Sequence, residues 1–390
     1  MTDLVPPRLG TPVQVKGWCP GAVRPMPAQD GWVVRIRPPG GRLTMAQAQG
    51  VAELASRFAQ PLLELTNRAN LQLRGVQPAQ HPLLLDGLRA LQLVDDDAGG
   101  EARRNVQVQP LWLAGDVTPE LARRLSEQLT RAHALAALPA KFGFAVDTGE
   151  QPCLREAYAD IRLERHADGV LVYADGASHG VVASVQAAPQ LAVDLAHWFL
   201  SAGGAPCGRG RMHALLRQCR LPAQWQQTPV AAASGVAPGP GVYPAGRLVG
   251  LAFGLVQART LAALGACGPL RLTPWRSLLL EGTAELPHCP ELIVAPADAR
   301  LRVAACTGSP GCDQAAGPTR GLALELAPSV PLGHLLHVSG CIKGCAHPKT
   351  AATVVATPQG FDFVRLGTAA SVPSHRGVGR ADLAQLLGDL

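Results

Sequence analysis

The chain repeats one order of strands and helix, and this repeat constrains its fold more than any other feature of the sequence. Segment 31–76 begins with alternating apolar residues typical of a strand. It passes through a Pro-Pro-Gly-Gly turn and continues with apolar residues at helical spacing and two further strands around a turn. Segment 246–283 shows the same strand, helix, strand order, and the string LELTNRANLQL matches LRLTPWRSLLL in spacing, with Leu65 opposite Leu272. Internal duplication therefore predicts two halves of a ferredoxin-like unit that pair across a pseudo-twofold axis and hold a ligand between them.

The remaining segments are also paired. The strings LPAKFGFAVDTG and LLHVSGCIKGCAHP each combine an apolar strand with a loop that carries a lysine, Lys141 or Lys343, and a hairpin follows each. The predicted fold class is α+β, with two ferredoxin-like half-domains and two α/β domains related by pseudo-twofold duplication. The predicted limits are 1–85 for the first half-domain, 86–228 for the first α/β domain, 229–287 for the second half-domain and 288–390 for the second α/β domain.

Composition and charge exclude several classes of protein. The 390 residues are 47% hydrophobic and 16% charged, which is typical of an ordered globular protein of two or three domains. A net charge of +6 without a long Lys/Arg run disfavours nucleic acid as a partner, whereas isolated arginines inside motifs favour a polyanionic small molecule. No apolar run reaches the roughly 18–20 residues of a membrane span, and the N-terminal residues have no apolar signal core. With ten cysteines and no export signal, we expect a cytoplasmic protein that does not enter a membrane.

Four cysteines near the C-terminal end form two close pairs. They are spaced Cys306-x5-Cys312 and Cys341-x3-Cys345, in the Gly-rich strings CTGSPGC and SGCIKGC. One segment separates the pairs, so both can converge on one point, and the small residues let the backbone approach a bulky inorganic group. Four thiolates at one point are what a [4Fe-4S] cluster requires. The pattern therefore favours an iron–sulfur redox protein.

Other roles for these cysteines stay open at this point. They could be buried small hydrophobic residues, a zinc site or two disulfides. Zinc sites favour pairs spaced by about two to four residues, so the five-residue gap fits zinc poorly. The six other cysteines are scattered, and we expect them to be buried free thiols; they are Cys19, Cys153, Cys207, Cys219, Cys267 and Cys289.

The cysteine spacing and the paired domains resemble the sulfite/nitrite reductase superfamily over nearly the whole chain. Within it, the strings RIRPPGGRLT, LTNRANLQLRG, LPAKFGFAVD, ACTGSPGC and VSGCIKGCAHP are most similar to the precorrin-3B synthase family, whose members are monooxygenases of the aerobic cobalamin route. The family's KGCAHP string is intact at 343–348. The resemblance implies that Cys306, Cys312, Cys341 and Cys345 bind the cluster, with Cys345 nearest the substrate cleft.

The same resemblance implies a set of substrate-binding residues. The arginine before PPGG is Arg37, that of the T-x-R element is Arg68, that of R-N-V is Arg104, and the lysine of P-x-K-F is Lys141. In the reductases these positions line the sirohaem face that binds a small oxyanion, or hold the carboxylates of the macrocycle. Asn70 follows Arg68 by two positions and is expected to join them. An arginine keeps its charge when buried and binds a carboxylate through paired hydrogen bonds.

Two departures separate the chain from the reductases. The reductases carry a second lysine two residues after the first, where this chain has Gly143, and their R-Q-N element is Arg68-Ala69-Asn70 here. Both losses favour the precorrin branch, whose substrate is itself a sirohaem-like tetrapyrrole. A sirohaem-dependent sulfite or nitrite reductase is the alternative.

The resemblance also implies a reaction and its cofactors. It is the O2-dependent hydroxylation of precorrin-3A at C20 with formation of a γ-lactone, with NADH as the final electron source. Activation of O2 usually needs a metal with an open coordination position, so we expect a possible mononuclear non-haem iron, with His347 as a candidate ligand and catalytic residue. No G-x-G-x-x-G string follows a predicted strand, so we expect a separate electron-donor protein to deliver the electrons.

Overall fold

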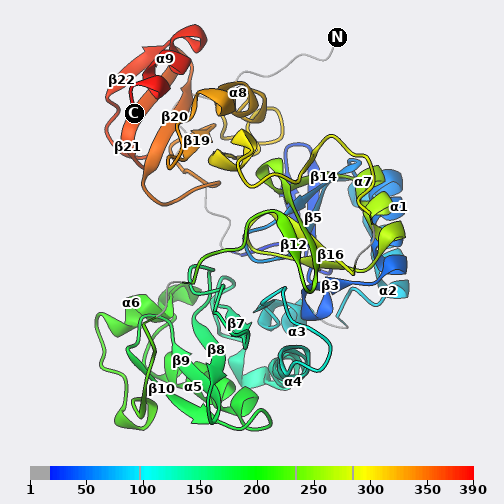
Figure 1. Ribbon diagram of the computed structural model, residues 1–390, viewed down its shortest axis with the longest axis vertical. Helices are drawn as coiled ribbons and strands as arrows, with labels where there is room; N and C mark the ends of the chain where they lie inside the picture. The colour runs from blue at the N-terminus through cyan, green and yellow to red at the C-terminus, as the bar shows by residue number, and fades with distance from the viewer. Residues whose placement is uncertain (1–17, 96–97, 233–234, 283–284) are drawn as a thin grey trace.

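The computed structural model describes residues 18–95, 98–232, 235–282 and 285–390. Within these ranges the chain forms four β-sheets with helices packed against them. The two half-domains lie between the two α/β domains, as Figure 1 shows. The predicted α+β class is confirmed by this arrangement.

The first half-domain is built on a five-stranded sheet with strand order β1-β2-β5-β4-β14. Its strands are β1 (Met26–Ala28), β2 (Gly31–Ile36), β5 (Leu71–Val76), β4 (Leu62–Leu65) and β14 (Leu255–Gln257). Helix α1 (Met45–Phe58) covers the sheet and begins with a capping box. The Thr44 hydroxyl accepts a hydrogen bond from the backbone N–H of Gln47, and the Gln47 side-chain oxygen accepts one from the backbone N–H of Thr44. Helix α2 (His81–Ala90) follows.

The second half-domain repeats this arrangement, with strand order β12-β13-β16-β15-β3 and β17 paired to β13. Its strands are β12 (Gly241–Tyr243), β13 (Gly246–Leu251), β16 (Ser277–Glu281), β15 (Leu270–Leu272), β3 (Arg42–Leu43) and β17 (Leu292–Ile293). Helix α7 (Ala258–Cys267) lies beside α1, as Figure 1 shows. Gly265 permits this approach, because a side chain there would lie 2.7 Å from the Cβ of Ala48.

The two half-domains exchange short strands. β3 comes from the first half of the chain but pairs with β15, and β14 comes from the second half but pairs with β4. One hydrophobic core runs through both half-domains and includes Val51, Leu71, Leu261 and Leu278. Because of this exchange, each sheet contains a strand from the other half of the chain. The domain limits predicted from the sequence stay a prediction.

The duplication extends to the backbone of one turn. Leu65 pairs with Leu71 in the first copy, and Leu272 pairs with Leu278 in the second. At the tip of each turn one residue has a left-handed backbone, which is rare for residues other than glycine. These two residues are Ala69, with φ of 52°, and Arg276, with φ of 60°.

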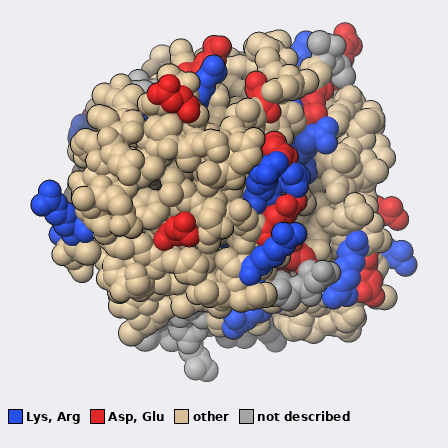
Figure 2. Space-filling view, turned by 90° about the horizontal axis from the view of Figure 1, so that it is seen from below, with Lys and Arg blue, Asp and Glu red and all other residues tan. Residues whose placement is uncertain are grey.

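The first α/β domain has a six-stranded sheet with order β11-β10-β9-β8-β7-β6, in which β6, β7 and β8 are parallel and the rest antiparallel. Its strands are β6 (Val106–Val108), β7 (Phe144–Asp147), β8 (Ile161–His166), β9 (Gly169–Ala174), β10 (His179–Ala183) and β11 (Thr228–Pro229). Its helices are α3 (Ala98–Arg103), α4 (Thr118–Arg131), α5 (Ala188–Ser201) and α6 (Met212–Leu216). Figure 2, seen from below Figure 1, shows positive and negative side chains interleaved along a band on a largely uncharged face.

The second α/β domain has the same pattern of parallel and antiparallel neighbours in the order β18-β19-β20-β21-β22. Its strands are β18 (Val303–Ala305), β19 (Leu336–Ser339), β20 (Ala351–Thr357), β21 (Gly360–Gly367) and β22 (His375–Val378), and its helices are α8 (Arg320–Leu326) and α9 (Leu383–Gly388). β18 and β19 therefore stand in this sheet where β6 and β7 stand in the first.

Candidate active site

The two cysteine pairs follow neighbouring parallel strands. Residues 306–312 lie in the loop after β18, and residues 341–346 lie in the loop after β19; we call them the first and second cysteine loops. β18 and β19 pair in parallel with Ala305 opposite Val338. Because the carboxyl ends of parallel strands meet at one edge of a sheet, the topology brings both loops together there.

All four of these cysteines line one cavity of about 710 Å³, and all are free thiols. Burial raises the pKa of Cys341 and of Cys345, and the neighbouring cysteines raise both further against the opposing effect of Lys343. The backbone N–H of Gly340 donates to Sγ of Cys306 at 3.2 Å. Ionisation of Cys341 and Cys345 is therefore disfavoured until a cation joins them in the cavity.

Four cysteine thiols on one cavity are the donor set that a [4Fe-4S] cluster takes. In the parts of the chain that the structure describes, no three Cys, His, Asp or Glu side chains gather closely enough to share one metal. In a [4Fe-4S] cluster each thiolate binds a different iron atom, so the sulfur atoms stand farther apart than around one zinc. An N–H donor to a cysteine sulfur is also a contact that tunes such clusters.

Cationic residues surround the cysteines. Among the described residues that line the cavity, five carry positive charge and one, Asp313, carries negative charge. The five are Arg74, Lys141, Arg209, Arg211 and Lys343. The first half-domain and both α/β domains contribute to this set. A cavity of this size with a positive wall can take a polycarboxylate ligand.

Two of the predicted substrate residues lie next to each other at this cavity. Lys141 is exposed and lines it, and Nη2 of Arg68 donates to the carbonyl oxygen of Lys141 at 3.5 Å. The Arg68 guanidinium lies 5.3 Å from the centre of the Tyr158 ring, and its buried Nε has no hydrogen-bond partner among the described residues. Burial lowers the pKa of Arg68, and the nearby Arg211 lowers it further. Arg68 is therefore a cation with donor capacity left for a ligand.

Asn70 lies in the turn that positions Arg68. The Thr66 hydroxyl accepts from the backbone N–H groups of Arg68 and Asn70, and the N–H of Thr66 donates to the carbonyl oxygen of Asn70. The Asn70 side chain is buried. Its backbone thus closes the turn, and a contact with substrate stays a prediction.

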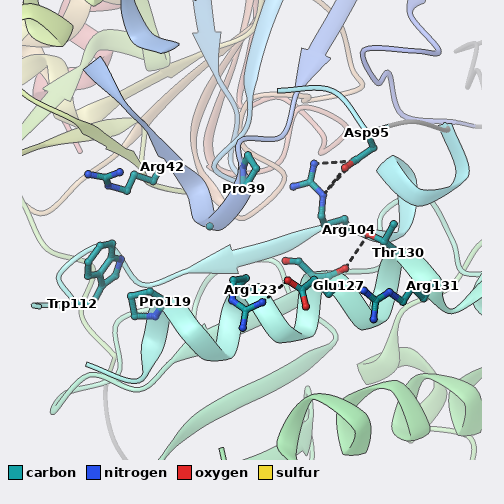
Figure 3. Close-up of a pocket in the computed structure, with 12 residues that line it drawn as sticks. Pro39, Arg42, Asp95, Arg104, Trp112, Pro119, Arg123, Glu127, Thr130 and Arg131 are labelled. Carbon is teal, nitrogen blue, oxygen red and sulfur yellow. Dashed lines mark hydrogen bonds and ion pairs between the residues drawn. The ribbon is translucent and has the colours of Figure 1, made fainter. Parts of the chain in front are cut away.

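Arg37 and Arg104 lie together, bound to carboxylates of the protein. Arg37 forms an ion pair with Glu101 at 2.9 Å, and Arg104 forms one with Asp95 at 2.8 Å. Nη1 of Arg104 donates to the carbonyl oxygen of Arg37. Figure 3 shows Arg104 bound to Asp95 at a second cavity, of about 570 Å³, which residues of α4 also line. The structure does not bring these two arginines to the wall of the cysteine cavity.

His347 lies beside the second cysteine loop, half-buried, with its ring 6.0 Å from that of His337. Burial lowers the pKa of His347, and Arg276 and Lys349 lower it further, so the imidazole is held neutral. A neutral imidazole is the form that binds a metal. Ligation of a mononuclear iron by His347 stays a prediction.

Three comparisons with known proteins bear on the site. The model of the nitrite/sulfite reductase ferredoxin-like half domain matches residues 24–91. A precorrin-3B synthase from Sinorhizobium sp. is 32% identical over 95% of this chain and 88% of its own length. The chain belongs to the precorrin-3B synthase family. The family assignment suggested by the cysteine strings is thereby confirmed.

The reductases are more distant relatives of this precorrin-3B synthase family member. A ferredoxin–nitrite reductase from Synechococcus elongatus is 29% identical over 36% of this chain and 29% of its own length. The solved structure of the NirA protein of Mycobacterium tuberculosis superposes with a TM-score of 0.62 at 18% identity, covering 91% of this chain and 79% of that one. This likeness confirms the reductase-like fold alone.

Sequence reasoning missed several residues at the site of this family member. Arg74 and Arg211 line the cysteine cavity, and Cys19, taken for a scattered thiol, lines it as well. Arg276 lies at the second cysteine loop. Arg74 and Arg276 both fall inside the repeated segments 31–76 and 246–283, where a charged residue next to strand residues was the available signal. None of the helices described is both long enough and apolar enough to span a membrane.

Proposed function

We propose that this chain is a precorrin-3B synthase, an O2-dependent monooxygenase that hydroxylates precorrin-3A at C20 and closes a γ-lactone onto the ring-A acetate. One oxygen atom of O2 enters the product, the other leaves as water, and NADH supplies the two electrons. The observation that carries the proposal is the cavity that combines four cysteines with a cationic wall, in a chain related to this family over almost its full length.

The cationic wall supports a tetrapyrrole substrate. Precorrin-3A carries many carboxylate arms, and an arginine can bind each arm through two parallel hydrogen bonds. In the proposal Arg68 and Lys141 bind one arm, since they adjoin each other, and Arg209 lies on the same cavity. Arg74 and Arg211 are already paired with Asp30 and Asp160, so they add less free charge.

The cysteines supply the redox part of the proposal. Cys306, Cys312, Cys341 and Cys345 would hold a [4Fe-4S] cluster, which supplies single electrons for the reduction of O2. The two glycines at the loops, Gly340 and Gly344, leave room near it, because a side chain at 340 would lie 2.6 Å from Ala315 and Gly344 has φ of 61°. The protein's part is to hold four thiolates around it.

A separate protein is proposed as electron donor. The electrons of NADH need a hydride-accepting cofactor before they reach a one-electron cluster, and no dinucleotide-binding string follows a strand in the sequence. The cytoplasm is the proposed location, because it provides the reducing conditions that keep ten thiols free.

Gly143 favours the monooxygenase over a sirohaem-dependent reductase. A side chain at this position would lie 2.8 Å from Nδ2 of Asn105, which is itself held by the carbonyl oxygen of Phe142 at 2.9 Å. A second lysine at 143 therefore needs Asn105 to move. Without a lysine at 143, this chain has one anion-binding charge fewer than the reductases.

The experiment is aerobic incubation of the purified protein with precorrin-3A and a reductant, followed by mass spectrometry. The proposal expects a product heavier by one oxygen atom, and a product without added oxygen would overturn it. A visible spectrum of the purified protein distinguishes the alternative, since tightly bound sirohaem would indicate a reductase.

A further inference from the structure

Two arginines, one from each half-domain, bind the backbone of the two cysteine loops. Nη2 of Arg74 donates to the carbonyl oxygen of Gly311 at 2.7 Å, and Nη2 of Arg276 donates to that of Ala346 at 2.7 Å. Gly311 directly precedes Cys312, and Ala346 directly follows Cys345. Each half-domain therefore binds a residue adjacent to a cysteine of the second α/β domain.

The Arg74 side chain, which contacts the first cysteine loop, is also held by a carboxylate of its own half-domain. It extends from β5, and its guanidinium forms two hydrogen bonds with Asp30, at 3.0 Å from Nε and 2.9 Å from Nη2. Paired bonds of this kind give a guanidinium one orientation. A side chain at residue 311 would lie 2.8 Å from Cγ2 of Thr307, and at ordinary contact distances of 3.5 and 3.7 Å from Asp30 and Arg74.

Arg276 is held differently but reaches an equivalent place. It occupies the left-handed position at the tip of the β15–β16 turn, the place that Ala69 has in the first copy. A long side chain in this backbone conformation is strained, and such strain persists where the surroundings determine it. Burial and the nearby Arg320 lower the pKa of Arg276, and within the described residues no carboxylate forms an ion pair with it. Its hydrogen bond goes to the second cysteine loop.

We propose that Arg74 and Arg276 are positioning residues, which hold Cys312 and Cys345 at the separation that a four-iron cluster needs. The inference rests on the proposed function only for the identity of the cluster. The paired half-domains form one core, so two arginines that extend from that core can fix two loops relative to each other. Within the C-terminal domain, Thr319 and Ser339 bind the carbonyl oxygens of Cys306 and Cys341, and the N–H of Gly340 donates to Sγ of Cys306. These contacts hold the ends of the loops that follow the strands, whereas the two arginines bind next to Cys312 and Cys345, at the far ends.

The consequence is a link between the half-domains and the redox centre. A carbonyl oxygen bound to a guanidinium cannot turn toward the cluster, so the loop amides stay free to face the cysteine sulfurs. Loss of either arginine leaves its loop free to move away from the other. The cluster should then be released more easily, and its reduction potential should shift because hydrogen bonds to sulfur set that potential.

The test compares Arg74→Gln and Arg276→Gln with Arg302→Gln. Arg302 is the matched control, since it donates to the carbonyl oxygens of Val330 and Ala297 inside the C-terminal domain and contacts no cysteine loop. After anaerobic reconstitution, the first two variants should lose iron to a chelator roughly tenfold faster than the wild type, in line with the loss of one charged hydrogen bond. Their midpoint potentials should shift, and Arg302→Gln should match the wild type.

Two further measurements keep the inference open to refutation. In the metal-free protein, amide hydrogen exchange in segments 306–312 and 341–347 should be faster in the variant that lacks the corresponding arginine. Arg276→Lys and Arg74→Lys should restore part of the protection, because lysine keeps a charged donor. Chelator, potential and exchange results equal to the wild type would overturn the inference. If the wild type binds no cluster at all, the proposed cofactor fails, and the exchange results alone decide the role of the arginines.

Discussion

The guanidinium of Arg37 and the carboxylate of Glu101 lie 2.9 Å apart, and both side chains are almost fully buried. Glu101 also accepts from the backbone N–H of Ala22 at 2.7 Å. The charge of Arg37 is thus balanced inside the protein, by a residue 64 positions further along the chain. The pair joins the first half-domain to α3 and to the segment before β1.

Glu101→Gln should destabilise the protein, because it leaves the buried charge of Arg37 without a counter-charge. Loss of one partner of a buried pair costs about 3–5 kcal/mol in the free energy of unfolding. The measurement is urea unfolding followed by circular dichroism. Arg89→Gln is the control, since its pair with Asp86 is exposed and should contribute less than about 1 kcal/mol. Equal unfolding midpoints for the two variants would contradict this role for Glu101.

Arg68→Ala should weaken the binding of precorrin-3A while leaving the fold intact. Within the described residues its Nε has no hydrogen-bond partner and its Nη2 makes only a long bond, of 3.5 Å, to the carbonyl oxygen of Lys141, so the guanidinium keeps donors for a carboxylate. A charged hydrogen bond is worth roughly 1.5–3 kcal/mol, so the dissociation constant should rise by about tenfold or more. Anaerobic titration with precorrin-3A measures it. Arg57→Ala, on α1, is the control, and unaltered affinity of the Arg68 variant would remove this residue from the site.

Gly143→Ala should destabilise the first α/β domain, because a methyl group there would lie 2.8 Å from Nδ2 of Asn105. Overpacking of this kind costs typically about 1–3 kcal/mol. Gly149→Ala is the matched control, since its nearest neighbour would lie at 3.5 Å, an ordinary contact distance. Thermal unfolding of both variants tests this prediction. A Gly143→Ala protein as stable as the wild type would show that a reductase lysine could also be accommodated.

Asp147 should make stability depend on pH in the acidic range. Burial raises its pKa from 3.8 to about 6, although it accepts hydrogen bonds from the backbone of Cys153 and Leu154. Between these pH values the folded protein binds a proton that the unfolded chain has released. The free energy of unfolding should therefore fall as the pH rises from about 4 to about 6, by about 3 kcal/mol.

The Asp147→Asn variant isolates this contribution. Its free energy of unfolding should lack the fall between pH 4 and pH 6 that the wild type shows, when both are measured by urea unfolding across that range. Asp168→Asn is the control, because the Asp168 side chain is 84% exposed. Parallel pH profiles for the wild type and Asp147→Asn would contradict the raised pKa.

The local elements of the fold and the cysteine site could be predicted from the sequence. Apolar spacing predicted a helix within segment 31–76, where α1 lies, and the matched spacing around Leu65 and Leu272 predicted two equivalent turns. The four cysteines converge on one cavity, as the spacing of the two pairs predicted, and they do so because they follow adjacent parallel strands, which the sequence did not indicate. These features depend on residues close together in the chain.

Contacts between distant residues could not be predicted in the same way. The exchange of β3 and β14 depends on how two finished half-domains meet, and no local pattern in Arg42–Leu43 indicates which sheet it joins. The partners of Arg37 and Arg104 are carboxylates in other segments, so a buried ion pair could not be distinguished from a substrate contact. The family resemblance predicted substrate binding for both arginines, but it does not indicate which carboxylates of this chain pair with them.

Incubation under ¹⁸O2 tests the central claim most directly, with the wild type beside Cys341→Ser and Cys267→Ser. Cys341 lines the cysteine cavity, whereas Cys267 ends α7 in the core of the half-domains. The account predicts that the wild type and Cys267→Ser convert precorrin-3A to a product that contains one ¹⁸O atom, and that Cys341→Ser forms none. Product oxygen that comes from water, or full turnover by Cys341→Ser, would contradict it.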